Sequence, residues 1–228
     1  MDATILVEIN AARQARKAVA VVTNIATGDQ QLLTRESSMD EALRHEVEQR
    51  LKSGKSGIVS LEQGETFIQV HVPAPRLVII GAVHISQALV PMAQACEFDV
   101  LVIDPRTAFA SKDRFPSVEL LAEWPQEVLN ERPLDAYTAL VAVTHDPKID
   151  DMPLQSALEN DCFYIGALGS RKTHAKRLDR FAEAGIDDTK VQRIHAPIGL
   201  DIAAASPAEI AVSIMAEIIE TLRKGPVI

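Results

Sequence analysis

Residues 76–86, RLVIIGAVHIS, decide how the larger part of this chain folds. A short apolar run leads into Gly81, and a helical pattern follows the glycine directly. A strand, a glycine turn and a helix in this order form the context of a dinucleotide-binding fingerprint. A second apolar run, VLVID, ends in Asp104 about 20 residues further on, where an acid can hold a ribose hydroxyl. The stretch therefore predicts a Rossmann-type nucleotide-binding unit.

The fingerprint departs from its usual form at two positions. Val83 stands where the second glycine is expected, and Ser86 stands where the third is expected. A β-branched side chain crowds the approach to a pyrophosphate, and a positive φ is costly for valine. His84 is a side chain that a nicotinamide dinucleotide does not need. Two interpretations stay open, a Rossmann loop for another ligand and one that binds no dinucleotide.

The rest of the chain divides at Pro73–Pro75. Residues 1–73 are predicted to form a small α+β domain, with helices over 3–14 and 39–51, Ser38 as a cap, and a hairpin turning at Gly28-Asp29. Residues 74–228 are predicted to form a doubly wound α/β domain, because short apolar strands alternate with helices. Its strands are RLVII, VLVID, ALVAVT and CFYIG, with helices from Ser86, near Val118–Glu123, around Asp151–Asn160, over Ser170–Glu183 and from a capping box at Ser206.

In a doubly wound sheet, ligands bind at the carboxyl ends of the strands, so the loops that follow the strands are informative. After CFYIG, Gly166 and Gly169 free the backbone and Ser170 is placed to cap a helix. Cations in the first turn of a helix oppose its dipole, and in a chain of net charge −9 such a cluster indicates an anion site. That site is predicted to use Arg171, with Lys172 and His174, whereas a solvated face is the interpretation of Lys176, Arg177 and Arg180.

Two further loops carry candidate polar groups. Thr144, His145 and Asp146 lie at the end of the strand ALVAVT, and all three are candidates for ligand contact. Asp150 or Asp151 is predicted to cap the next helix, in preference to a metal site. His195 lies in a loop with Gly199 and Asp201 and, on these grounds alone, is a structural histidine. Cys96 and Cys162 are predicted to be core residues, with sulfur carriage by Cys162 as the alternative.

The composition excludes several classes of protein. A chain of 228 residues with net charge −9 is not a non-specific nucleic-acid binder, because phosphate contacts need clustered Lys and Arg. Two cysteines are too few for a disulfide framework, and no zinc spacing is present. No signal peptide is visible, and the apolar runs are too short for a membrane helix. The expected compartment is the cytoplasm.

The loops together resemble the XdhC/CoxI family, the accessory proteins of molybdenum hydroxylases such as xanthine dehydrogenase. The resemblance runs from about Pro75 to Lys224 and is carried by RLVIIGAVHISQAL, VIDPR followed by RFP, VAVTHDPKIDD, FYIGALGSRKTHAKRL and IHAPIGLDIAAASPAEIAVSIMAEI. It implies a Rossmann domain that binds molybdenum cofactor, promotes its sulfuration with a cysteine desulfurase, and helps to insert it into the apo-enzyme. The family usually has glycine at position 83 and an N-terminal GGCVE-type segment, which this chain lacks.

The resemblance and the loops together favour a cofactor-maturation factor that is not itself an enzyme, with no catalytic residue and no metal ligand assigned. An NAD(P)-dependent oxidoreductase is the alternative, and a partner-binding module with a vestigial pocket is the third hypothesis. Expected partners are the apo-form of a molybdenum hydroxylase, a cysteine desulfurase and a second copy of the chain. The predicted cofactor contacts are Gly81, His84, Asp104, Arg106, Thr144, His145, Asp146, Gly166, Gly169, Ser170, Arg171, His174 and His195.

Overall fold

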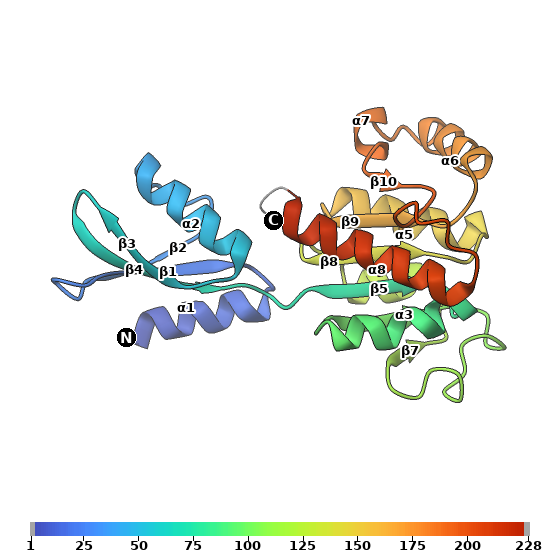
Figure 1. The fold of residues 1–228 in the computed structure, drawn as a ribbon, viewed down its shortest axis with the longest axis horizontal. Coiled ribbons are helices and arrows are strands. Elements are labelled where there is room, and N and C mark those ends of the chain that lie inside the picture. Colours follow the sequence, from blue (N-terminus) through green and yellow to red (C-terminus); the bar gives the residue numbers. More distant parts are fainter. Residues whose placement is uncertain (1–2, 226–228) are drawn as a thin grey trace. The chain divides into compact units, whose positions relative to one another are not determined.

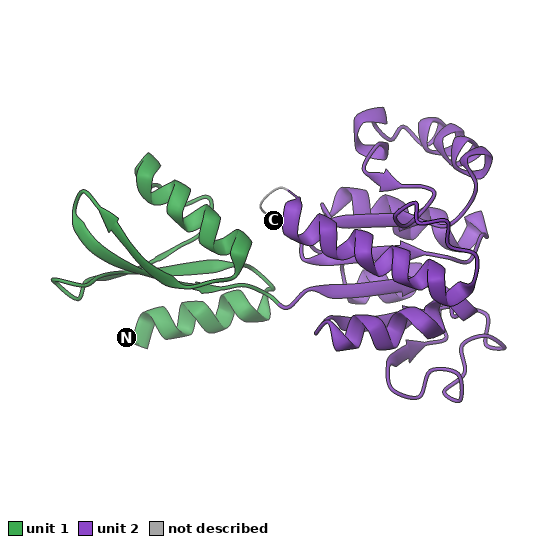
Figure 2. Cartoon of the chain, viewed as in Figure 1, with its two compact units in different colours: residues 1–73, 226–228 green, residues 74–225 purple. Residues whose placement is uncertain are grey.

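The computed structural model describes residues 3–225. The described residues form two compact units, residues 3–73 (unit 1) and residues 74–225 (unit 2) (Figure 2). Within the described residues, no helix is long and apolar enough to cross a membrane.

Unit 1 is a four-stranded antiparallel sheet, in the order β2-β1-β4-β3, with one helix on each face (Figure 1). Alternate residues of β1 supply the two cores, because Ala20 packs with α2 residues while Val19 and Val21 pack with α1 residues. The elements are α1 (Ala3–Gln14), β1 (Val19–Asn24), β2 (Gln30–Leu33), α2 (Glu41–Ser53), β3 (Gly57–Leu61) and β4 (Gly64–His71).

The predicted hairpin is confirmed, since β1 and β2 pair around Gly28, which has a φ of 78°. The predicted cap of the second helix is wrong. Asp40 and not Ser38 caps α2, because its carboxylate accepts a hydrogen bond from the Leu43 amide at 2.8 Å.

Unit 2 is a six-stranded sheet in the order β10-β9-β8-β5-β6-β7, and all of its neighbouring strands are parallel. The predicted doubly wound α/β fold is therefore confirmed. The chain adds strands outward from β5 to β7 and then returns to place β8 on the other side of β5, so the switch point lies between β5 and β8. The strands are β5 (Arg76–Ile80), β6 (Asp99–Ile103), β7 (Glu119–Leu121), β8 (Thr138–Ala142), β9 (Tyr164–Ala167) and β10 (Ile194–His195).

Helices cover both faces of this sheet, which explains why its strands are apolar throughout. On one face, Leu77 and Ile79 pack with α3 and α8, and on the other, Val78 and Ile80 pack with α4 and α5. The helices are α3 (His84–Ala95), α4 (Pro125–Glu131), α5 (Pro147–Glu159), α6 (Arg171–Glu183), α7 (Asp188–Val191) and α8 (Pro207–Lys224).

Two helix predictions in unit 2 differ from the structure. Residues 119–121 form the edge strand β7, paired with β6, and the helix begins only after Trp124, with Pro125 at its first position. The helix expected around Asp151 starts four residues earlier, at Pro147. The capping box at Ser206 is confirmed, because Ser206 and Glu209 exchange hydrogen bonds with each other's backbone amides.

Candidate functional site

The turn after β5 requires glycine at its first position. Gly81 has a φ of 120°, and a Cβ there would lie 2.9 Å from Thr144 Cγ2. Thr144 follows β8, so the glycine allows the two strands at the switch point to end in close contact. Any side chain at this position would meet both an unfavourable φ and a steric clash.

Valine at the second position of the fingerprint is not strained. Val83 is the residue before α3 and has an extended backbone with φ −99°, so the expected cost of a positive φ does not arise. Ser86 is fully buried, and its hydroxyl donates to the Gly81 carbonyl oxygen at 2.5 Å, which ties the helix to the turn. His84, at the start of α3, is exposed.

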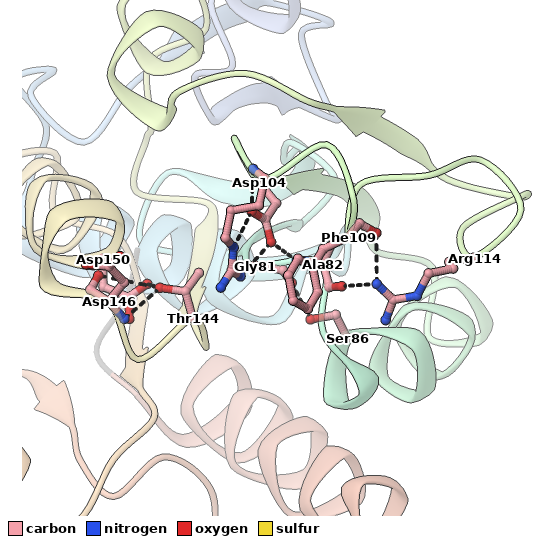
Figure 3. Close-up of polar contacts among 10 residues, drawn as sticks. Gly81, Ala82, Ser86, Asp104, Phe109, Arg114, Thr144, Asp146 and Asp150 are labelled. Carbon is pink, nitrogen blue, oxygen red and sulfur yellow. Dashed lines mark hydrogen bonds and ion pairs between the residues drawn. The ribbon is translucent and has the colours of Figure 1, made fainter.

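Asp104 lies at the end of β6, as predicted, but its carboxylate is fully buried and fully used (Figure 3). It accepts hydrogen bonds from the amide of Ala82 at 2.7 Å and from Arg106, through the backbone amide at 2.9 Å, Nε at 2.9 Å and Nη2 at 2.8 Å. Although burial opposes the charge, these hydrogen bonds outweigh it and hold the pKa of Asp104 below its ordinary value. The carboxylate fixes the turn and Arg106, and it has no free oxygen for a ribose hydroxyl.

Arg114 connects the loop between β6 and β7 to the same turn by hydrogen bonds, and it was not among the predicted cofactor contacts. Its guanidinium donates to the carbonyl oxygens of Ala82 at 2.8 Å and Phe109 at 2.9 Å, and to Gln87 Oε1 at 3.0 Å. Arg106 stacks over the ring of Phe109, with 4.5 Å between the guanidinium carbon and the ring centroid. Arg114 thus holds this loop against the turn and the start of α3, while Arg106 packs within the loop and binds Asp104.

On the other side of the switch point, Thr144, Asp146 and Asp150 form a hydrogen-bonded group (Figure 3). The Thr144 hydroxyl donates to Asp150 Oδ1 at 2.6 Å and accepts from the Asp146 amide at 3.1 Å. Asp146 is the cap of α5, so the prediction that Asp150 or Asp151 caps this helix is wrong. Asp150 is 1% exposed, and burial raises its pKa to about 6. Its second oxygen, Oδ2, has no hydrogen-bond partner within the described part of the chain.

A pocket of about 240 Å³ opens beside this group, between the start of α5 and the first turns of α6. Four of its side chains are cationic. It is lined by His145, Pro147, Asp150, Lys172, Thr173, Lys176, Arg177 and Arg180.

The interpretation of Arg177 and Arg180 as a solvated face is wrong. Arg177 is only 3% exposed, because it points from α6 toward Leu168 and Asp150 rather than to water. Arg180 binds Asp151 through two hydrogen bonds, at 2.5 and 2.9 Å. Arg177 lies four residues before the buried Phe181 and so on the same face of α6, but this spacing does not show which residues that face packs against.

The loop before α6 has the predicted cap but a different arrangement of its other residues. Ser170 accepts a hydrogen bond from the Thr173 amide at 3.2 Å. Arg171 is exposed and does not line the pocket. Gly169 has a φ of 138°, whereas Gly166 is buried, and a Cβ there would overlap Ile198 and the Tyr164 hydroxyl. Gly166 therefore makes room for packing and does not face a ligand. His174 sits beside Arg177, and burial lowers its pKa, with the guanidinium adding to the effect.

His195 belongs to a second polar group on the opposite face of the sheet. Its Nδ1 lies 3.0 Å from Glu217 Oε1 on α8, and its ring stacks on Tyr164 at 4.7 Å. The same carboxylate accepts from the Tyr164 hydroxyl at 2.6 Å and the Gly199 amide at 2.8 Å. These contacts agree with the structural interpretation of His195 and separate it from the α5–α6 pocket.

The two cysteines differ from each other. Cys162 is fully buried, as predicted, and burial raises the pKa of its thiol to about 12. Cys96 is exposed at the end of α3, so its prediction as a core residue is wrong. Because α3 runs back from the carboxyl edge of the sheet, Cys96 lies at the edge remote from the pocket. Within residues 3–225, no group of three or more His, Cys, Asp or Glu side chains could hold a metal ion.

The strand order, the switch point and the glycine turn define this unit as a Rossmann-type domain. The family described as the XdhC Rossmann domain matches residues 77–218, and the chain belongs to this family.

Three curated proteins are similar to this chain over part of their length. The uncharacterized protein YqeB of Escherichia coli (strain K12) is 32% identical over 70% of this chain and 30% of its own length. A protein of Bacillus subtilis (strain 168), named as a probable xanthine dehydrogenase subunit, is 33% identical over 71% of this chain and 47% of its own length. The "molybdenum cofactor insertion chaperone PaoD" of E. coli (strain K12) is 31% identical over 64% of this chain and 40% of its own length. The chain thus aligns with less than half of each relative.

A crystal structure described as a xanthine dehydrogenase from Bacillus halodurans has the same fold. The alignment has a TM-score of 0.68 at 24% identity and covers 97% of this chain and 67% of that one. The aligned part of this chain includes residues of both units.

Proposed function

We propose that this chain binds molybdenum cofactor and assists its insertion into a molybdenum hydroxylase of the xanthine dehydrogenase type. The observation that carries the proposal is the cationic pocket between α5 and α6, which lies at the carboxyl edge of the sheet in a chain of net charge −9. Two relatives support it by their names, one a molybdenum cofactor insertion chaperone and the other a probable xanthine dehydrogenase subunit.

The residues present fit the phosphate of a pterin cofactor. Four cationic side chains line the pocket, and the guanidinium of Arg177 is buried there without a short hydrogen bond to any described residue. The cofactor itself would supply the molybdenum chemistry to the client enzyme, while this chain would bind it and shield it from water. The accessible predicted residues on this side of the sheet are proposed as further contacts, namely His84, Arg106, His145, Asp146, Gly169, Ser170, Arg171 and His174.

Sulfuration of the bound cofactor, with a cysteine desulfurase as the sulfur source, is part of the proposal. Neither cysteine of this chain is placed to relay the sulfur, because the Cys162 thiol is buried with a pKa of about 12 and Cys96 lies at the opposite edge of the sheet. The desulfurase would therefore have to deliver sulfur directly to the cofactor. A homodimer and a cytoplasmic location remain predictions.

A nicotinamide dinucleotide is the alternative ligand, and the saturated carboxylate of Asp104 argues against it. Calorimetric titration with molybdopterin, NADH and NADPH separates the two ligand classes. Of these three ligands, we expect only molybdopterin to bind. The double variant Lys172→Gln with Lys176→Gln should bind molybdopterin about tenfold more weakly, since two exposed phosphate contacts contribute about 1–2 kcal/mol. Lys190→Gln, on α7 outside the pocket, is the control. Full affinity in the double variant, or heat from the dinucleotides alone, would contradict the proposal.

A further inference from the structure

Two buried and opposite charges in the α5–α6 pocket are incompletely satisfied. Asp150 is 1% exposed and Arg177 is 3% exposed, and the pocket is lined by both. Asp150 Oδ2 and Arg177 Nε have no hydrogen-bond partner among the described residues. Buried charged groups are normally fully hydrogen-bonded, because an unmade bond to a charge costs more than one to a neutral group.

The contacts that Arg177 does make are long. Nη2 lies 3.4 Å from the Leu168 carbonyl oxygen, Nη1 lies 3.4 Å from His174 Nδ1, and Nε lies 3.9 Å from Asp151 Oδ1. Asp151 is meanwhile held at shorter distances by Arg180. The guanidinium therefore keeps donors for an acceptor that enters the pocket, and Lys172 and Lys176 supply positive charge at its mouth.

A free carboxylate oxygen beside such a site restricts which anion fits. Asp150 lines the pocket, and because its Oδ1 already accepts from Thr144, the buried Oδ2 is the carboxylate oxygen that remains without a partner among the described residues. A fully deprotonated oxyanion would bring oxygen against oxygen with like charge. An oxyanion that carries a hydroxyl group would instead donate its proton to Oδ2 while its other oxygens face the cations.

We propose that this pocket binds a phosphate-type oxyanion through Arg177, Lys172 and Lys176, and that Asp150 selects an anion that bears a proton, hence phosphate over sulfate. The inference deepens the proposed function and rests on it only for the natural ligand, the phosphate group of the pterin cofactor.

The proton that is shared in this complex can lie on either partner. Burial raises the pKa of Asp150 to about 6, which is close to the second pKa of a phosphate monoester, about 6. The titratable and charged groups around Asp150 are Arg177 from α6, Arg106 from the loop after β6, and His145 and Asp146 before the start of α5, with Lys172, Lys176 and Arg180 around the pocket. Sulfate has no proton at neutral pH, so it would bind only when Asp150 is itself protonated.

Titration of the full chain with inorganic phosphate and with sodium sulfate, followed by amide NMR signals, tests the selectivity. At pH 7.5 we expect phosphate to shift the amides of residues 144–150 and 171–177 and to bind about 10- to 100-fold more tightly than sulfate, as one hydrogen bond to a charged group implies. At pH 5.5 sulfate affinity should rise toward that of phosphate.

Asp150→Asn is the decisive variant, because its side-chain amide can donate to either anion. We expect it to bind sulfate at pH 7.5 with an affinity within about twofold of phosphate. Lys172→Gln with Lys176→Gln should weaken both anions, and Lys190→Gln should weaken neither. Equal affinity of the wild type for the two anions at pH 7.5, or no shift with either, would overturn the inference.

A parallel molybdopterin titration keeps the two proposals apart. Molybdopterin binding without phosphate selectivity removes this inference and leaves the proposed function intact. Selective phosphate binding without molybdopterin binding removes the proposed function and leaves this inference intact.

Discussion

The buried carboxylate of Asp104 allows a quantitative test of how the site is held together. In Asp104→Asn the side-chain amide must place its NH₂ group either toward the Ala82 amide and Arg106 Nη2, or toward the backbone amide and Nε of Arg106. Each orientation therefore replaces one backbone hydrogen bond and one guanidinium hydrogen bond by a clash between donors. Bonds to a charged group contribute about 1.5–3 kcal/mol each. Because the Arg106 side chain is 32% exposed and water can replace part of its loss, we expect the free energy of unfolding to fall by about 3 kcal/mol.

Urea unfolding followed by the fluorescence of Trp124, the single tryptophan, measures this loss within unit 2. Asp99→Asn, at the exposed start of the same strand, is the matched control and should change the free energy of unfolding by less than about 0.5 kcal/mol. Since the pKa of Asp104 is lowered in the folded state, its stabilisation is complete above the unfolded pKa and is lost as the pH falls through the folded value. A loss below about 1 kcal/mol at pH 7, or an equal loss in the control, would refute this account.

Three further outcomes follow from the geometry. Gly81→Ala should destabilise unit 2 by about 2–5 kcal/mol in the same urea assay, from the φ of 120° and the contact with Thr144, whereas Gly185→Ala, with open space around it, should lose only about 1–2 kcal/mol. Between pH 4 and pH 7 the free energy of unfolding of Asp150→Asn should rise by about 3 kcal/mol relative to that of the wild type, because the raised folded pKa makes the wild type lose stability as the pH rises through about 6. A difference between the two proteins that does not change with pH would contradict this. A thiol reagent should label one cysteine, Cys96, in the native protein and both in urea, and labelling of native Cys162 would exclude its burial.

The features that local sequence determines could be predicted well. The capping box at Ser206 depends on two residues three positions apart, and the glycine turn at Gly81 follows directly from a strand that precedes a helix. Both features can be predicted from a few consecutive residues, without knowing which distant residues pack against them. The same holds for the alternation of apolar strands with helices, which predicts the parallel sheet.

The features that were missed depend on distant partners. Residues 119–121 form a strand because β6 offers an edge to pair with, although Glu and Leu favour a helix there. Asp104 follows β6 at the predicted position, but only the fold shows that its carboxylate oxygens accept hydrogen bonds from Arg106 and the Ala82 amide. The burial of Arg177 depends on how α6 packs near Leu168 and Asp150, which the residue spacing within α6 does not specify.

The short outer strands of unit 2 restrict how copies of this domain can meet. β7 has three residues and β10 has two, so each border of the sheet offers only a few backbone groups to a neighbouring chain. A sheet that continues from one copy into the next would gain little from such borders. Self-association of this domain, where it occurs, should therefore use side chains on its helices and loops, and adding further copies strand by strand should be disfavoured.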